Sequence, residues 1–318
     1  MTVAGVYSAG AIFLQTADPV MSAAVGFAGL VSEEINLGQE VRTGMESAGI
    51  YETRASIIKR APSIGWGTTQ VATALDMVGA AGRCINSDGS HPGLDAHLLA
   101  HDRCDARDLT AGLRYRIANG LLLPENLSVE HQGRAQLTGR AIAITDSNGN
   151  EPIAASSGVS FPSGAADDEE FGLYRQTVGG VTLTGAKRLS IDFGIEVTQE
   201  DADGSIYPEW VSVGAILTRI TIGGINPNWL GNAYGVAING ELITHANTTL
   251  RLVRYVNGQS YASLASAVHI AITVNGLGCI TTAASARDRS ASSTELMIYA
   301  LHDGSNAPLL FDTTAALT

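Results

Sequence analysis

The chain repeats its own sequence at a fixed offset of 156 residues. Residues 35–41 (INLGQEV) meet residues 191–197 (IDFGIEV) when the chain is laid on itself without a gap. Further identities at this offset pair Ile50-Tyr51 with Ile206-Tyr207, Ser56 with Ser212, Ile64 with Ile220, Gly67 with Gly223, Asn119-Gly120-Leu121 with Asn275-Gly276-Leu277, Thr138 with Thr294, Ile142 with Ile298, Asn150 with Asn306 and Pro152 with Pro308. Chance identities would drift in register over such a distance. The pattern predicts two copies of one domain, and chains of that kind often build symmetric assemblies.

The length of 318 residues fits two domains that can each bury a core, and a hydrophobic content of 45% indicates a globular chain. We expect domains at residues 1–160 and 161–318, separated by a polar stretch of small residues at 156–166. The acidic run at residues 167–170 then predicts an exposed, solvated linker. The copies differ most between residues 84 and 110, which predicts a long loop specialised in the first copy.

Strand patterns dominate both halves, so the predicted fold class is mainly β with minor α. Alternating or β-branched runs cover residues 54–60, 112–118, 140–145, 188–198, 210–222, 249–256, 268–274 and 295–301. Asn-Gly pairs begin at Asn119, Asn148, Asn239, Asn257 and Asn275, and this dipeptide favours hairpin turns. We expect a hairpin at Asn119 and at its repeat equivalent Asn275.

One helix is expected in the first copy. Thr68-Thr69 could cap a stretch that places Val71, Leu75 and Val78 on one face and ends near Gly79. The equivalent segment of the second copy carries Pro227 and Trp229 and predicts one or two helical turns at most. The three tryptophans, Trp66, Trp210 and Trp229, are interpreted as core or interface anchors.

The first thirty residues are largely apolar, but their pattern is typical of neither a signal peptide nor a membrane span. The first basic residue is Arg42, and Asp18-Pro19 interrupts the apolar run. We expect an ordered N-terminal arm or a first strand, and no membrane partner. A reaching arm predicts that deletion of residues 1–25 leaves folded protein that no longer polymerises.

The formal net charge of −12 argues against a surface that grips nucleic-acid phosphates. Lysine occurs only at Lys59 and Lys187. This balance does not argue against a surface past which DNA slides. Three cysteines, Cys84, Cys104 and Cys279, form no CxxC pair and no disulfide framework, and are interpreted as reduced thiols.

One cluster could carry chemistry. His97 and His101 would share a face if the intervening residues were helical, and Cys104 could complete a zinc shell. The cluster as a whole comprises His91, Asp95, His97, His101, Asp102, Cys104 and Asp105. The alternative is a polar surface loop with Leu98 and Leu99 tucked beneath it. The spacing matches no established zinc motif, so we assign no metal or cofactor.

No other segment predicts catalysis. A phosphate loop, a dinucleotide fingerprint and a nucleophile elbow are missing from the sequence, and the positions shared by the two copies are glycines, aliphatics and turn residues. The acidic segments 167–170 and 200–204 lack the spacing of a calcium loop. These shared residues indicate a scaffold rather than an enzyme.

The chain resembles the tail tube proteins of tailed bacteriophages. The segments that carry the resemblance are residues 49–69, 120–124, 193–224 and 301–309. The resemblance implies two tandem β-sandwich or half-barrel domains. Each ring would contain six such domains from three chains, as a homotrimeric pseudo-hexamer. The sheets of neighbouring domains would join into an inner β-barrel, which removes open strand edges.

The resemblance also implies partners and a location. Rings would stack into a tube and contact other tail proteins, and DNA would pass through the lumen without specific binding. The protein would be assembled in the host cytoplasm and reside in the virion. We expect lumen residues to be mostly Asp, Glu, Ser, Thr and Asn, and the 84–110 loop and the N-terminal arm to reach neighbouring rings.

Three alternatives stay open at this point. A different virion part, such as a decoration, baseplate or tail-tip protein, would differ in ring stoichiometry. A tandem β-sandwich binding or adhesion module would be monomeric and would need a concave ligand site. An enzyme would need converging polar residues, which only the segment 91–105 offers.

Overall fold

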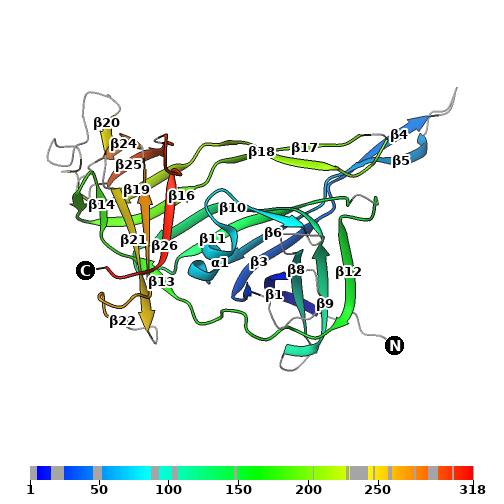
Figure 1. Ribbon diagram of the computed structural model, residues 1–318, viewed down its shortest axis with the longest axis horizontal. Helices are drawn as coiled ribbons and strands as arrows, with labels where there is room; N and C mark the ends of the chain where they lie inside the picture. Colours follow the sequence, from blue (N-terminus) through cyan, green and yellow to red (C-terminus); the bar gives the residue numbers. More distant parts are fainter. Residues whose placement is uncertain are drawn as a thin grey trace.

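The computed structural model describes residues 6–15, 25–45, 52–86, 93–101, 107–146, 149–202, 204–226, 229, 243–245, 248–256, 260–275, 277–285, 293–302 and 304–317. These residues form antiparallel β-sheets with a single α-helix among them, so the prediction of a mainly β chain is confirmed. The molecule is elongated, with a sheet at each end, a long sheet between them and two hairpins along one side (Figure 1).

A five-stranded sheet occupies the end of the molecule built from the first half. Its strand order is β12-β9-β8-β1-β2. The bounds are β1 Val6–Gln15, β2 Val25–Phe27, β8 Gly93–His101, β9 Arg107–Ile117 and β12 Ile153–Val159. β1 lies between β8 and β2, and its Ile12 and Phe13 are fully buried.

A seven-stranded sheet occupies the opposite end and is built from the second half. Its main path is β15-β14-β21-β23-β26, with β13 and β22 paired to β21. The bounds are β13 Phe171–Leu173, β14 Gln176–Val178, β15 Val181–Leu183, β21 Thr248–Val256, β22 Ser260–Tyr261, β23 His269–Val274 and β26 Leu309–Ala315. Read from its other end, this path is β26-β23-β21-β14-β15. Its strands then follow the same chain order as β12-β9-β8-β1-β2 of the first sheet.

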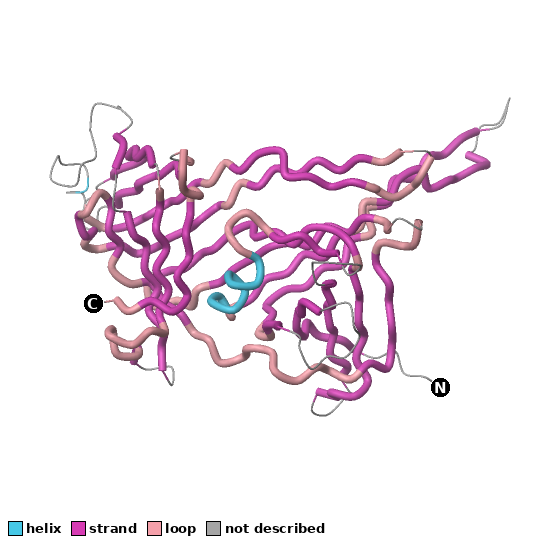
Figure 2. Tube along the Cα trace, viewed as in Figure 1, coloured by secondary structure: helices cyan, strands magenta, loops and turns pink. Residues whose placement is uncertain are grey.

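The third and largest sheet contains strands from both halves. Its path is β20-β24-β25-β19-β16-β10-β11-β6-β3, with β7 paired to β10. The bounds are β3 Leu30–Asn36, β6 Ser63–Thr68, β7 Arg83–Asn86, β10 Asn119–Glu130, β11 Gln136–Ile144, β16 Ala186–Asp192, β19 Arg219–Gly224, β20 Ile243–His245, β24 Leu277–Ser285 and β25 Ser293–Ala300. This ten-stranded sheet is continuous across the middle of the molecule (Figure 2).

Two β-hairpins extend from the ten-stranded sheet. One consists of β4 (Gln39–Met45) and β5 (Glu52–Arg60), and the other of β17 (Ile195–Glu200) and β18 (Trp210–Ile216). They lie in series along the upper side of the molecule in Figure 1, with the far end of β17–β18 at the base of β4–β5. A hydrogen bond from the Arg60 amide to the Ile206 carbonyl (2.6 Å) joins them.

The helix α1 (Val71–Val78) packs its apolar residues into the core, as the sequence predicted. Its cap differs from the prediction. The Thr68 hydroxyl binds the Ala28 carbonyl, and the Glu169 carboxylate accepts from the Ala72 and Thr73 amides at 2.9 and 3.2 Å. A carboxylate at a helix N-terminus satisfies free amides and complements the helix dipole. One residue of the predicted solvated linker therefore ties α1 in place.

Two further residues of the acidic run form ion pairs. Asp168 is 3.1 Å from Arg254, and Glu170 is 2.9 Å from Arg134. Ahead of the run, Ala166 forms backbone hydrogen bonds with Gly26 and Ala28, which keeps it beside β2. The run thus docks against both halves, because it contacts Arg134 in the first and Arg254 in the second.

The sequence left open an N-terminal arm or a first strand, and residues 6–15 form a strand, β1, between β8 and β2. Its apolar residues fill the core, so the expectation of an arm is corrected for these residues. The predicted loop at 84–110 is a second correction, because this stretch contains β7, β8 and the start of β9. Both segments form edges or interiors of sheets instead of free extensions.

Two predicted long strands are each divided in two. The run 188–198 breaks between β16 and β17 at Gly194, whose φ of +57° suits glycine. The run 210–222 breaks between β18 and β19, where the Leu217 amide donates to the Gly194 carbonyl at 2.9 Å. At the first break the chain leaves the ten-stranded sheet and enters the hairpin, and at the second it returns to the sheet.

The Asn-Gly pair at Asn119 marks a change of sheet and no hairpin. β9 belongs to the five-stranded sheet and β10 to the ten-stranded one, and the two do not pair. β23 and β24 change sheets at Asn275 in the same way, although Gly276 lies outside the described residues. The pairs that begin at Asn239 and Asn257 lie outside the described residues, as does Asn148 itself, whereas Gly149 has a φ of +72° and its amide donates to the Asp146 carbonyl at 3.0 Å.

Candidate assembly interface

The ten-stranded sheet is formed from two groups of strands with the same order. The first half contributes β7-β10-β11-β6-β3 and the second β20-β24-β25-β19-β16. The register repeats as well: Asn36 lies opposite Ser63, and Asp192 opposite Arg219, which is the same pair displaced by the offset of the sequence repeat. The bulge between Leu30 and Ser32 also recurs between Ala186 and Arg188.

The hairpins repeat this offset. Gln39 lies opposite Arg60 in β4–β5, and Ile195 opposite Ile216 in β17–β18. A bulge after Glu40 has its counterpart after Glu196. Gly38 and Gly194 have positive φ and accept a hydrogen bond across the same turn, from Ala61 and Leu217. The backbone pairing at these turns and at the first bulge is thus the same in the two hairpins, although β4–β5 has a second bulge that β17–β18 lacks.

The strand pair β10–β11 matches its counterpart β24–β25 at an offset of 157 residues, one residue longer than the offset of the sequence repeat. The bulge between Pro124 and Asn126 in β10 corresponds to the bulge between Thr281 and Ala283 in β24. The residues of β11 that face the main core are Leu137, Gly139, Ala141 and Ala143, whereas buried Ile142 faces the second hairpin; those of β25 are Thr294, Leu296, Ile298 and Ala300. The identities Thr138–Thr294 and Ile142–Ile298 therefore join residues on opposite faces of equivalent strands.

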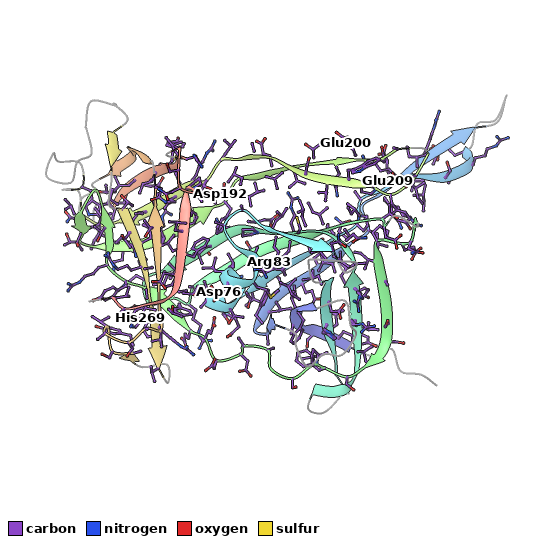
Figure 3. All side chains as sticks on the ribbon, in the orientation of Figure 1. Asp76, Arg83, Asp192, Glu200, Glu209 and His269 are labelled. Carbon is purple, nitrogen blue, oxygen red and sulfur yellow. The ribbon has the colours of Figure 1, made fainter. Side chains whose placement is uncertain are left out.

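The two groups meet at the junction of β10 and β16. Five consecutive residue pairs join these strands, from Asn126 with Asp192 to Glu130 with Arg188. The Phe193 amide adds a hydrogen bond of 3.0 Å to the Glu125 carbonyl. Below the strands, Leu127, Leu189 and Ile191 belong to one continuous core. Figure 3 shows Asp192 at this junction.

The second hairpin rests on the strands of the first half. Leu121, Leu123 and Ile142 form a small apolar cluster on the outer face of β10 and β11, and Ile195, Val197 and Val211 pack against it. Further along, the Thr145 amide donates to the Pro208 carbonyl at 3.0 Å. Glu200 and Glu209, labelled in Figure 3, lie opposite each other where the paired strands end. The hairpin is thus anchored along its length by the neighbouring half.

The rest of the outer face of the ten-stranded sheet is mostly polar, because polar residues alternate with the buried aliphatics of most strands, although Met297 and Tyr299 of β25 also face outward. The polar outward residues include Ser32, Glu34, Asn36, Ser63, Asn126, Ser128, Glu130, Thr138, Arg140, Arg188, Ser190, Asp192, Arg219, Thr221 and Glu295. Each arginine has a partner: Arg140 lies 3.1 Å from Glu125, Arg188 pairs with Glu295, and Arg219 lies over the Tyr299 ring. Paired guanidinium groups offer little attraction to a phosphate backbone.

Of the residues considered for a metal site, Asp95, His97 and His101 lie on β8 and not in a loop. Residues four apart on a strand are separated by about 13 Å, whereas a helix would bring His97 and His101 to about 6 Å. His97 is buried between Phe13 and Phe161, and burial lowers the pKa of its imidazole to about 4. The side chain of His101, and His91, Asp102, Cys104 and Asp105, lie outside the described residues. In the described part of the chain, no three metal-binding side chains gather.

Asp95, a member of the sequence cluster, and Glu33, which the sequence did not single out, both have buried carboxyl groups. Asp95 is fully buried, burial raises the pKa of its carboxyl, and Arg116 and Arg114 oppose that rise from 3.9 Å. Burial raises the pKa of Glu33 to about 8, opposed by a hydrogen bond from the Gly10 amide. Glu33 takes the place that Leu189 occupies in the second half. Alternation along residues 30–36 would have shown that position 33 faces inward.

The other sequence candidates are structural. Trp66 and Trp229 are buried, and Trp229 donates to the Thr184 carbonyl, whereas Trp210 is 56% exposed on β18. Cys84 is a free, exposed thiol. In the acidic segment 200–204, Asp201 lies 4.0 Å from Lys59. Buried His269, labelled in Figure 3, accepts from the Arg254 amide and contacts the Ser263 carbonyl, which satisfies both ring nitrogens.

Comparison with known proteins gives no identification. No protein-family model matches the chain, and no curated protein matches it. Among the described residues, no helix is both long and apolar enough to cross a membrane.

Proposed function

We propose that the chain is a structural subunit with two copies of one tube domain, and that three chains close into a pseudo-hexameric ring of a bacteriophage tail tube. The observation that carries the proposal is the junction of β10 and β16, which fuses two groups of strands with the same order and register into one sheet. Two domains joined edge to edge resemble two adjacent units of a ring. Repetition of the same junction between chains would leave no open edge.

The polar outer face of the ten-stranded sheet supports a role as a DNA conduit. Its residues are mostly Ser, Thr, Asn, Asp and Glu, which is the composition expected of a lumen. Since its three arginines are engaged with Glu125, Glu295 and Tyr299, the face would release few counterions on contact with DNA. Rings of this kind would stack and contact other tail proteins, and the protein would reside in the virion.

The test is the shape and mass of the purified protein. Negative-stain electron microscopy should show rings or tubes with three-fold symmetry. Light scattering should give a ring mass about three times the 33.0 kDa of one chain. A strictly monomeric protein at high concentration would contradict the proposal and favour a tandem binding module. Rings of another stoichiometry would favour a different virion part.

A further inference from the structure

The repeated register leaves equivalent strands in unequal positions. β16 has β19 on one side and β10 on the other, whereas its counterpart β3 pairs only with β6 among the described strands. β10 likewise carries β16 along residues 126–130, but the counterpart stretch of β24, residues 283–285, pairs only with β25 in the described part of the chain. The chain thus has two edges, unpaired among the described strands, that correspond to the two strands joined at its own centre.

We propose that β3 of one chain pairs with β24 of a second copy, in the register of the β10–β16 junction. This inference rests on the proposed ring. The pairs follow when β16 is replaced by its counterpart β3 and β10 by its counterpart β24. Positions 36, 35 and 34 would lie opposite positions 283, 284 and 285, as Asp192, Ile191 and Ser190 lie opposite Asn126, Leu127 and Ser128.

The first hairpin shows the same missing neighbour. In the second half, Phe193 is fully buried with its ring against Phe311 of the same half, and Val197 packs on the cluster of Leu121, Leu123 and Ile142 from the first half. Their counterparts in the first half, Leu37 and Val41, are 51% and 53% exposed. Exposed aliphatic residues at equivalent positions indicate that the first hairpin lacks an apolar surface to pack on within the single chain. We call this missing surface the hairpin seat.

The second copy would supply that seat at the counterparts of Leu121, Leu123 and Ile142. These are Gly278, Ile280 and Tyr299 on β24 and β25, so Ile280 and Tyr299 are the positions that could supply apolar side chains. Tyr299 is partly buried and holds Arg219 over its ring. Strand pairing and hairpin docking then occur on the same partner, because β3 leads directly into β4. The contact is head-to-tail, so repetition gives either a closed ring or an open helix of chains.

The register is tested by cysteine pairs on the outer face. After mild oxidation, Glu34→Cys with Ser285→Cys should give a disulfide between chains, seen as dimers and trimers on non-reducing gels and located by mass spectrometry. Ser128→Cys with Ser190→Cys, the equivalent pair within one chain, is the positive control and should give an internal bond. Glu34→Cys with Ala284→Cys should not cross-link, because a slip of one residue places the side chains on opposite faces.

The hairpin seat is tested by two neighbouring substitutions. Val41→Asn should reduce ring formation at least tenfold with an unchanged melting temperature, since Val41 has no seat within the described part of the chain. Arg42→Asn, whose counterpart Thr198 faces solvent, should leave ring formation unchanged. Val197→Asn should instead lower the melting temperature.

The outcomes separate this inference from the proposed function. Rings that form normally without the 34–285 cross-link, while the 128–190 control closes, would overturn the β3–β24 register and leave the ring proposal standing. Rings unaffected by Val41→Asn would overturn the hairpin seat. Absence of any oligomer would overturn both the ring and the edge pairing.

Discussion

Single residues carry the difference between the two halves of the molecule. Glu33 faces the core at the position where the second half has Leu189, and its carboxyl oxygens have no side-chain partner among the described residues. Burial of an ionised carboxylate is costly, which is why the pKa of Glu33 rises to about 8. Ionised Glu33 therefore destabilises the first half locally, whereas Leu189 at the equivalent position of the second half carries no charge.

The sign of this effect gives a pH prediction. The folded pKa of Glu33 lies above its unfolded value, so the folded state binds more protons, and stability falls as pH rises from about 4.5 through 8. Glu33→Gln should remove this fall and raise the free energy of unfolding at pH 8 by on the order of 2 kcal/mol. Denaturant melts of both proteins at pH 5 and pH 8 measure it. An equal gain at both pH values would contradict the assigned cause.

His97 predicts the opposite slope. Burial lowers the pKa of His97 to about 4, so the unfolded state binds the extra proton and stability falls as pH drops from 6.5 toward 4. His97→Gln should flatten the stability profile over that window and leave the profile between pH 7 and 8 unchanged. Thermal melts across both windows are the measurement. A profile that stays steep below pH 6.5 would assign the acid sensitivity to other groups.

At the scale of elements, the helix α1 depends on a carboxylate from the segment between the halves. Glu169→Gln should lower the free energy of unfolding by about 1 kcal/mol, because the helix loses a charged acceptor for the Ala72 and Thr73 amides. Asp167→Asn, an exposed neighbour in the same acidic run, is the matched control and should have little effect. Equal losses in both variants would indicate a general charge effect instead of a cap.

Sequence periodicity found most strands but not their connections. Alternation predicted β21 and β23 closely, because one face of each strand is buried, and the β-branched run at 54–60 predicted the exposed strand β5. It could not locate the break at Gly194, where only a positive φ and a change of sheet distinguish two strands from one. The segment around His97 was ambiguous for a related reason, since apolar residues that are buried on both faces of a strand do not alternate.

The candidate interface was even less accessible from sequence. The β10–β16 junction is a contact between the two halves, and the residue pattern of neither strand predicts which strand it pairs with. The longer offset that relates β24 and β25 to their counterparts was also hidden, because chance identities at Thr294 and Ile298 supported the shorter one. Only the buried and exposed faces of the strands distinguish the two alignments.

At the scale of the whole molecule, the N-terminal segment belongs to the core. Deletion of residues 1–25 removes β1 from between β2 and β8, so we expect insoluble or unfolded protein rather than a folded monomer. Circular dichroism and a melting curve of the deletion variant measure this. A cooperative melt at the wild-type temperature would restore the interpretation of this segment as an arm.

The unequal positions of β3 and β24 have a consequence for mixed populations of chains. A variant that is blocked at β3 but intact at β24 would still be accepted by a normal neighbour, and would then stop growth. If three chains must close together, the yield of complete rings falls as the cube of the fraction of normal chains. A minority of blocked subunits would therefore inhibit ring assembly by the normal subunits, which is a dominant-negative effect.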